Sequence, residues 1–484
     1  MNVRRRVTES SPAPASLRRS LAALAAAAVV SSSLAISHAS YAATPSAVQP
    51  RVSPYPSTSY AVIKTIGVGS GPYGIAVDSA DDSVYIANYS ANTVSVIDGQ
   101  SGAVSGAAIS VGSGPWGVAV NEQDDSVYVA NTLSSNLSIF SGLTRAVATS
   151  NGGGAISAPK AVAVDQTDDT IYVANNGDDR VVALAGSTLA VTSTLIGDLP
   201  QGVAVNNADD TVYSTAIGTG STDDSVWILR GASLAVDDTV SVGRQPWWVA
   251  VDQLDDTVYV PNGDSGTLSV IRGTSGTVVR TIPLGSDPRG VAVQSPGGTV
   301  YIAVSGSDKV AVLPGSNLDD SVLLDVGNQP IGVAVDASGA NAGLGYVANN
   351  LDNSVSVIGR ATTTPAPSSG VAGATVTLEV AVPGVSYLMD DTTIQTVKFN
   401  GSNVAASRVA GQNKWTFTVP SGTAGSTVDI EVRYQGGLWA SAGSFTYATP
   451  TPPPTPSFPP GPPTNVTAEP GYESGRVTFE PPTN

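Results

Sequence analysis

Cysteine is absent from the 484 residues of the chain, and the single histidine is His38. The chain therefore cannot form disulfides, Cys-His catalytic pairs or cysteine-ligated zinc sites. If the segment that contains His38 is removed, Ser-His-Asp catalysis and histidine-ligated zinc, copper, iron or haem are excluded as well. Any remaining chemistry would have to use carboxylates, lysine, tyrosine or cations bound by oxygen.

Basic and aromatic residues are also few. Lysine and arginine number 22 against 39 acidic residues, which gives a net charge of −17, and aromatic residues make up 6% of the chain. Nucleic acids and anionic lipids are bound by clustered Lys and Arg, so this balance argues against both partners. By contrast, 51 glycines and 33 prolines indicate many turns.

The N-terminus has the features of an export signal. Basic residues precede an apolar stretch at 21–36, and Ser40, Tyr41 and Ala42 form a small-x-small cleavage site. Serines at 31–33 interrupt the stretch, which is short for a membrane span. We expect residues 1–42 to be a signal peptide, and the mature protein to be secreted or on the cell surface without being an integral membrane protein. Taking the five arginines and Glu9 of this segment from the 22 basic and 39 acidic residues leaves 17 and 38, a net charge of −21.

One sequence motif recurs along most of the chain at intervals of 41 to 46 residues. Aligned on its proline, the copies begin at Pro72, Pro115, Pro159, Pro200, Pro246, Pro288 and Pro330. In the first copy, short β-rich segments at 74–78, 83–88, 93–98 and 107–111 are separated by turn residues. Four strands at this period are typical of a propeller blade.

The two ends of the array predict closure. Residues 61–68 are similar to a fourth strand but precede the first copy, while the seventh copy has no fourth strand. We therefore expect an all-β fold: a seven-bladed β-propeller over residues 60–360, preceded by a linker at 43–59 and closed by the N-terminal strand. An open solenoid is the alternative, and it would leave one strand surplus and one missing.

The second segment of each copy carries a family resemblance. The sequences YIAN at 85–88, YVAN at 128–131 and 172–175, and YVAN at 346–349 resemble the signature of YVTN-type β-propeller repeats. Residues 213–216, 259–262 and 301–304 depart from it. The resemblance implies a propeller of the kind common on prokaryotic surfaces, in a family that mostly lacks an assigned reaction, and so it indicates fold more than function.

The remaining chain predicts further β-modules. A linker is expected at 361–369. Residues 370–448 resemble an IPT/TIG immunoglobulin-like domain through VKFNG at 397–401, FTVPSG at 417–422 and GSFTY at 443–447, which implies a C-terminal Ig-like β-sandwich. Residues 449–463 form a proline-rich linker. Residues 464–484 resemble the start of a fibronectin type III domain, truncated at Asn484.

Paired aspartates recur between the first two segments of a copy, as Asp81-Asp82, Asp124-Asp125, Asp168-Asp169, Asp209-Asp210 and Asp255-Asp256. Aspartate serves backbone donors in turns, so we interpret the pairs as turn residues. A calcium site on Asp78, Asp81 and Asp82 is an alternative, although the spacing is not that of an EF-hand. A catalytic dyad would not need five copies.

The position after each repeat proline varies while its surroundings repeat. It is occupied by Tyr73, Trp116, Lys160, Gln201, Trp247, Arg289 and Ile331. The innermost strand of each blade begins here, so these side chains are expected around one mouth of the central channel, with Trp248 adding bulk. Aromatic and basic residues suit stacking on sugar rings and pairing with carboxylates. The alternative is that they only fill the channel.

These features favour an exported, non-enzymatic binding or adhesion protein. Candidate ligand-binding residues are Tyr73, Trp116, Lys160, Gln201, Trp247, Trp248 and Arg289, and the expected partner is a glycan or a cell-envelope polymer or protein. No cofactor is required. One alternative is a calcium-dependent, lactonase-like propeller hydrolase or a lyase. Another is a structural surface-layer component.

Overall fold

The computed structural model describes residues 53–449 except 187, 198, 219–223, 316 and 340, together with residues 464–469 and 476–480. The predicted signal peptide at 1–42 lies outside the described residues. So do most of the linker predicted at 43–59 and nearly all of the proline-rich linker at 449–463. Within the described part of the chain, no helix is long and apolar enough to cross a membrane.

The described chain is all-β, apart from five single-turn 3-10 helices. The repeats fold into antiparallel sheets, consistent with a β-propeller. The first two sheets contain β2 (Pro72–Asp78), β3 (Ser83–Asn88), β4 (Thr93–Asp98), β5 (Ala103–Val104) and β6 (Ile109–Ser110), then β7 (Pro115–Asn121), β8 (Ser126–Asn131), β9 (Asn136–Ser141) and β10 (Ala148–Ser150). The next two contain β11 (Pro159–Asp165), β12 (Thr170–Asn175), β13 (Arg180–Ala185) and β14 (Val191–Leu195), then β15 (Pro200–Asn206), β16 (Thr211–Ala216), β17 (Ser225–Arg230) and β18 (Ala235–Ser241).

The later repeats follow the same order. They contain β19 (Ala250–Asp252), β20 (Thr257–Asn262), β21 (Thr267–Arg272) and β22 (Thr277–Pro283), then β23 (Pro288–Gln294), β24 (Thr299–Val304), β25 (Lys309–Leu313) and β26 (Val322–Asp325). The last repeat supplies β27 (Pro330–Val335), β28 (Gly345–Asn349) and β29 (Ser354–Ala366). The 3-10 turns are η1 (Gly152–Gly154), η2 (Asn176–Asp178), η3 (Gly231–Ser233), η4 (Gly273–Ser275) and η5 (Ser305–Ser307).

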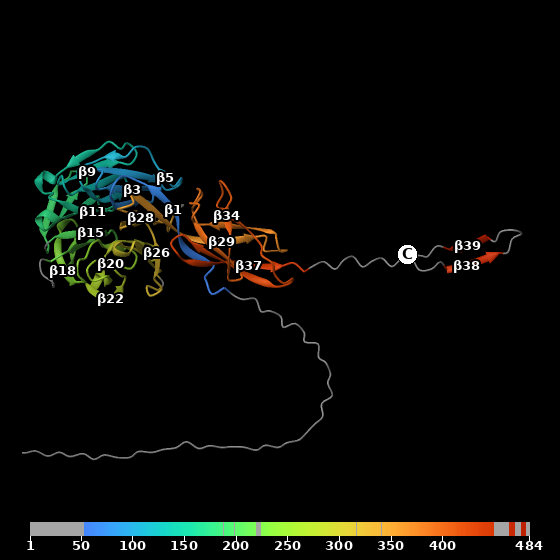
Figure 1. The fold of residues 1–484 in the computed structure, drawn as a ribbon. Coiled ribbons are helices and arrows are strands. Elements are labelled where there is room, and N and C mark those ends of the chain that lie inside the picture. The colour runs from blue at the N-terminus through green and yellow to red at the C-terminus, as the bar shows by residue number, and fades with distance from the viewer. Residues whose placement is uncertain are drawn as a thin grey trace, which may run out of the picture. The chain divides into compact units, whose positions relative to one another are not determined.

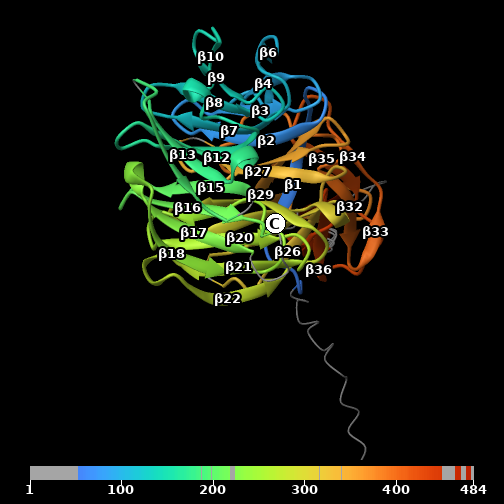
Figure 2. The same cartoon turned by 90° about the vertical axis from the view of Figure 1, so that its left-hand side faces the viewer.

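The N-terminal strand pairs with the last repeat. Strand β1 (Thr58–Gly67) runs antiparallel to β29, with Thr58 opposite Thr362 and Gly67 opposite Ser354. Figures 1 and 2 both show these strands side by side, although they are some 300 positions apart in the sequence. The surplus strand at one end of the array thus occupies the place left free at the other, as the sequence predicts.

The first strands of the repeats contact one another in a closed cycle. Strand β2 contacts β7, each later inner strand contacts the next, and β27 contacts β2 again. Glycine allows this approach. A Cβ atom built on Gly74, Gly290 or Gly332 would lie less than 3.0 Å from a backbone carbonyl oxygen of the next inner strand.

Two expectations about local structure were wrong. The fourth strand of the first repeat is not one segment at 107–111 but two short strands, β5 and β6, which both pair with β4. Residues 361–366, expected in a linker, continue strand β29, and Ala361 is fully buried. Pro365 is tolerated there because residues 363–366 of β29 pair on one side only, with β31, so a position without an N–H can lie on the unpaired side.

The C-terminal region contains two sheets on a shared core. The second half of β29 pairs with β31 (Thr375–Ala381), followed by β35 (Lys414–Thr418) and β34 (Ala406–Arg408). The other sheet contains β30 (Ser369–Gly370), β37 (Trp439–Tyr447), β36 (Thr427–Tyr434), β32 (Ile394–Phe399) and β33 (Ser402–Val404). Buried Leu378, Trp415, Ile430 and Phe445 belong to one apolar cluster contributed by both sheets. Farther along, β38 (Thr464–Glu469) pairs with β39 (Arg476–Glu480).

Candidate functional site

The variable position of each repeat follows an unusual turn. The residue before each repeat proline has a positive φ, from 41° at Ala158 to 65° at Gly71. In six of the inner strands, the ladder then shifts register between the proline and the residues that follow it. A bulge of this kind re-aims the side chain next to it. The repeated backbone therefore delivers a non-repeated side chain to the same end of every inner strand.

Three aromatic side chains meet at this end of the inner strands. The ring centres of Tyr73 and Trp116 lie 4.1 Å apart, and Tyr89 lies 5.7 Å from each of them. Offset and tilted pairs at these distances are favourable. Together with Lys160, these residues are called the mouth cluster below.

Lys160 is the charged member of the mouth cluster. Its Nζ atom lies 3.3 Å from the centre of the Trp116 ring, a cation–π contact, and the side chain is half-buried. No carboxylate among the described residues forms an ion pair with it. Burial lowers the pKa of Lys160 to about 8. The mouth cluster thus holds a cation without an anion.

Arg289 lies over a second tryptophan. Its guanidinium is 4.7 Å from the Trp247 ring centre and pairs with Asp287 at 2.8 Å. It also lies near Tyr73, whose pKa is raised by burial despite this positive neighbour. The arginine therefore links the mouth cluster to Trp247, but its charge already has a partner.

Two variable positions are withdrawn from the surface. Gln201 is only 8% exposed and donates from Nε2 to the Leu199 carbonyl at 3.0 Å. Ile331 is 1% exposed. Of the predicted site residues, the structure thus brings Tyr73, Trp116 and Lys160 together and buries Gln201.

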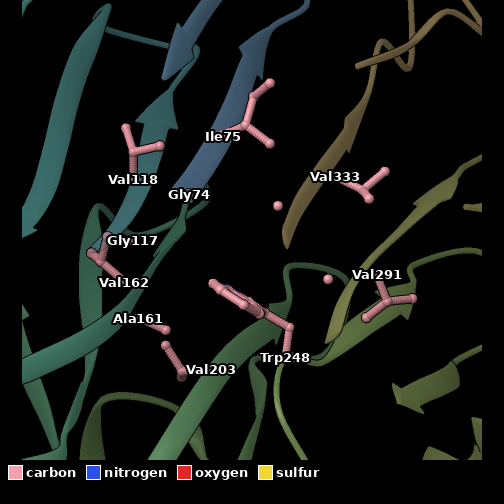
Figure 3. Close-up of a pocket in the computed structure, with 12 residues that line it drawn as sticks. Gly74, Ile75, Gly117, Val118, Ala161, Val162, Val203, Trp248, Val291 and Val333 are labelled. Carbon is pink, nitrogen blue, oxygen red and sulfur yellow. The ribbon is translucent and has the colours of Figure 1, made fainter. Parts of the chain in front are cut away.

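Trp248 lies farther inside, where it lines a central cavity of about 120 Å³. In Figure 3 its ring projects into the space between glycine and valine residues of the other inner strands. Trp248 stands where most repeats have the close-approach glycine, and β19 accordingly begins only at Ala250. None of the described residues lining this cavity has an ionisable side chain.

The first aspartate of each pair supports its own turn. Its Oδ1 accepts a hydrogen bond from the backbone N–H two residues later, at 2.9 to 3.2 Å in all five pairs. The second aspartate has a positive φ, 62° at Asp82 and 56° at Asp256, which aspartate tolerates better than most residues. Both observations agree with the turn interpretation.

The second aspartate also reaches the neighbouring repeat. Asp256 accepts from Tyr213 Oη at 2.8 Å and from Asn206 Nδ2 at 3.0 Å, both in the preceding repeat. Asp169 likewise accepts from Asn121 at 3.1 Å, and Asp210 from Tyr172 at 3.1 Å. The tyrosine of the repeat signature and the aspartate pair therefore act together at the boundary between sheets.

The calcium site considered on Asp78, Asp81 and Asp82 is not assembled. Within the described part of the chain, no three His, Cys, Asp or Glu side chains converge as metal ligands. Asp81 bonds to the Ser83 amide, while Asp82 accepts from Gln100 on the other side of the turn. Asp78 is buried and bonds to the Ala80 amide, and burial raises its pKa to about 6.

Sequence reasoning missed Tyr89 and Asp287. Tyr89 follows β3 in a turn whose backbone hydrogen bond to Gly71 recurs in other repeats, for example from Thr132 to Gly114, but the residue at this position varies, so the repeated motif did not mark it. Asp287 precedes the repeat proline, and its positive φ and its pairing with Arg289 appear only in the folded chain. Variation at the position before the proline was the one signal that could have indicated Asp287.

Comparison with known proteins supports the fold. No protein-family profile matches the chain, and no curated protein matches it. Among solved structures, hydrazine synthase of Kuenenia stuttgartiensis is 20% identical at a TM-score of 0.52, and the match covers 59% of this chain and 95% of that one. Virginiamycin B lyase from Staphylococcus aureus is 13% identical at a TM-score of 0.51, covering 62% and 99%. These neighbours are β-propeller proteins, and at such identities the likeness shows the fold alone.

Proposed function

We propose that this chain is an exported, non-enzymatic binding or adhesion protein, and that the mouth cluster binds a glycan or cell-envelope polymer. In this proposal the repeats form a seven-bladed, YVTN-type propeller. Residues 370–448 form an IPT/TIG-like module, and residues 464–484 begin a fibronectin type III module. The export signal at 1–42 supports a secreted or cell-surface location.

The observation that carries the proposal is the pairing of Lys160 with Trp116. A half-buried cation without a described anionic partner favours a ligand that brings a negative charge. The adjacent faces of Tyr73, Tyr89 and Trp116 suit the apolar face of a sugar ring. An acidic polysaccharide, such as a polymer that contains uronic acids, combines both features.

The cavity chemistry supports binding over catalysis. Proton transfer needs an ionisable side chain within reach of the reacting atom. The described lining of the central cavity consists of glycine, alanine, valine, isoleucine and Trp248. The hydrolase and lyase alternatives would therefore have to use the mouth cluster, whose one free basic group is Lys160.

The test is binding of the full chain to an array of glycans and envelope proteins. Trp116→Ala should weaken binding by up to about tenfold, because stacking on one aromatic residue contributes about 0.5–1.5 kcal/mol. Trp439→Ala is the matched control, since Trp439 also lies beneath a lysine, with Lys398 Nζ 4.1 Å from its ring centre, but in the C-terminal sheets. Equal binding by wild type and Trp116→Ala would contradict the proposal. So would turnover of an arrayed compound that is lost in Lys160→Met.

A further inference from the structure

The boundary between the last and first repeats is one of three at which both equivalent residues are neighbouring aspartates, the other two being Asp78 with Asp125 and Asp165 with Asp210. At two boundaries, the asparagine that ends an inner strand donates to the turn aspartate of the next repeat, as Asn121 does to Asp169 and Asn206 to Asp256. Where the last repeat meets the first, the equivalent residues are Asp336 and Asp82. Burial and the nearby Asp82 carboxylate raise the pKa of Asp336 to about 7. While both are ionised, neither has a proton to donate.

Both carboxyls at this boundary are buried. Asp336 is 0% and Asp82 is 4% exposed. Asp336 accepts from the Ser338 amide and Asp82 Oδ2 from Gln100 Nε2, but Asp336 Oδ2 and Asp82 Oδ1 have no described partner. Two buried, adjacent negative charges are costly unless a positive species balances them.

The turn after β27 adds a third side chain. This turn is longer than its counterparts and has no aspartate pair. It carries Asn341, which is 0% exposed and has no described hydrogen bond to either Oδ1 or Nδ2. A buried amide with both ends unsatisfied is unusual in a folded protein.

Asn341 and Asp82 both lie against Gly99, and the Asp82 carboxyl lies against the turn that carries Asn341. A Cβ atom on Gly99 would lie 3.0 Å from Asn341 Nδ2 and 3.2 Å from Asp82 Cβ. A Cβ atom on Gly339, in the same turn as Asn341, would lie 3.2 Å from Asp82 Oδ1. The buried hydroxyl of Tyr346 is also without a described partner, whereas Tyr172 and Tyr213 donate to the turn aspartate of the next repeat.

We infer that Asp82, Asp336 and Asn341 bind a divalent cation, calcium by ligand chemistry, between the last and first repeats. The unsatisfied atoms include three oxygen acceptors, Asp82 Oδ1, Asp336 Oδ2 and Asn341 Oδ1. Calcium takes oxygen ligands from carboxylates and amides, and its two charges balance the two carboxylates. A water molecule alone would satisfy the hydrogen bonds of the Asn341 amide but would leave the two negative charges of Asp82 and Asp336 unbalanced. Because this boundary is also where the chain ends meet, the ion would fasten the ring at its seam.

The experiment compares the full chain after chelation with the same chain in calcium. Wild type should take up one calcium per chain, as measured by elemental analysis after gel filtration, and its melting temperature should rise with calcium concentration. Asp336→Asn recreates the boundary already present at Asn121 and Asn206, so it should fold and bind calcium at least tenfold more weakly. Asn341→Ala is the second variant with the same expectation. Asp165→Asn is the control, because Asp165 occupies the equivalent place in another repeat, and its calcium uptake should match wild type.

Calcium uptake that is equal in wild type, Asp336→Asn and Asn341→Ala would overturn the site. A melting temperature of wild type that is the same in calcium and in chelator would also overturn it. In that case a proton shared between the Asp82 and Asp336 carboxyls, and not a bound cation, would account for the unpaired oxygen atoms. A magnesium titration separates a general divalent site from one that prefers the larger ion.

Discussion

Replacing Lys160 by methionine should make the protein more stable and a poorer binder. Methionine keeps an unbranched apolar stem of similar length but removes the charge. Burial lowers the pKa of Lys160 from 10.5 to about 8. Taken in full, this shift means that the charged form destabilises the folded protein by roughly 3 kcal/mol. Partial exposure and the cation–π contact with Trp116 offset up to about 2 kcal/mol of this. We therefore expect Lys160→Met to gain about 1 kcal/mol at pH 7.

Because the pKa of Lys160 is lower in the folded than in the unfolded chain, the stability of the wild-type protein depends on pH in a direction that can be worked out. Below pH 8, Lys160 is charged in both folded and unfolded chains, and the folded state bears the whole cost. Between about pH 8 and pH 10.5, the folded state has released the proton while the unfolded state keeps it, so wild type gains stability as the pH rises. The advantage of Lys160→Met should therefore shrink over this window and vanish near its upper end.

Chemical denaturation at pH 7, 9 and 10.5 checks the expectation. Lys398→Met removes a lysine that lies over Trp439 and controls for lost positive charge in an acidic chain. If Lys160→Met is no more stable than wild type at pH 7, or if its gain in stability stays constant up to pH 10.5, the reasoning is refuted. Binding of an acidic ligand should weaken in the variant, and in wild type above pH 8.

Two further substitutions test the contacts between repeats. Gly332→Ala should destabilise the protein by about 2–3 kcal/mol, because its Cβ would meet the Tyr73 carbonyl of the first repeat, whereas Gly67→Ala has open space and should be neutral in the same thermal melts. An unchanged Gly332→Ala would mean that the inner strands are farther apart than described. Tyr213→Phe should cost about 1–2 kcal/mol in urea denaturation, because Asp256 loses one of its two cross-boundary donors. A double-mutant cycle with Asp256→Asn that gives no coupling energy would contradict this role.

The strands and turns of the repeats were well predicted from the sequence because the same motif of strand and turn residues recurs in each repeat. Strands β3 and β4 begin and end where their segments were expected. The site was predicted in part: the position after the proline marks Tyr73, Trp116 and Lys160, but its periodicity cannot show that Gln201 folds back onto Leu199. Burial of that kind depends on the neighbouring side chains in three dimensions.

Apart from the predicted pairing of β1 with the last repeat, contacts between distant segments could not be predicted from local sequence patterns. The continuation of β29 past Ala361 depends on β31, and the meeting of Asp82 with Asp336 depends on closure of the array. The turn after Asp336 is longer than its counterparts, and this can be seen in the sequence. That the turn brings Asn341 next to Asp82 is seen only in the folded structure.

Strand β29 has a mechanical consequence. Its first half lies between β1 and β28, and its second half pairs with β31, so the chain passes from the last repeat to the C-terminal sheets without a hinge. Tension applied from the C-terminal side would pull β29 along its own axis. The backbone hydrogen bonds to β1 and β28 would then be loaded together in shear instead of opening one at a time. A protein held at its C-terminal side and bound through its mouth cluster would transmit force through the strands that close its ring.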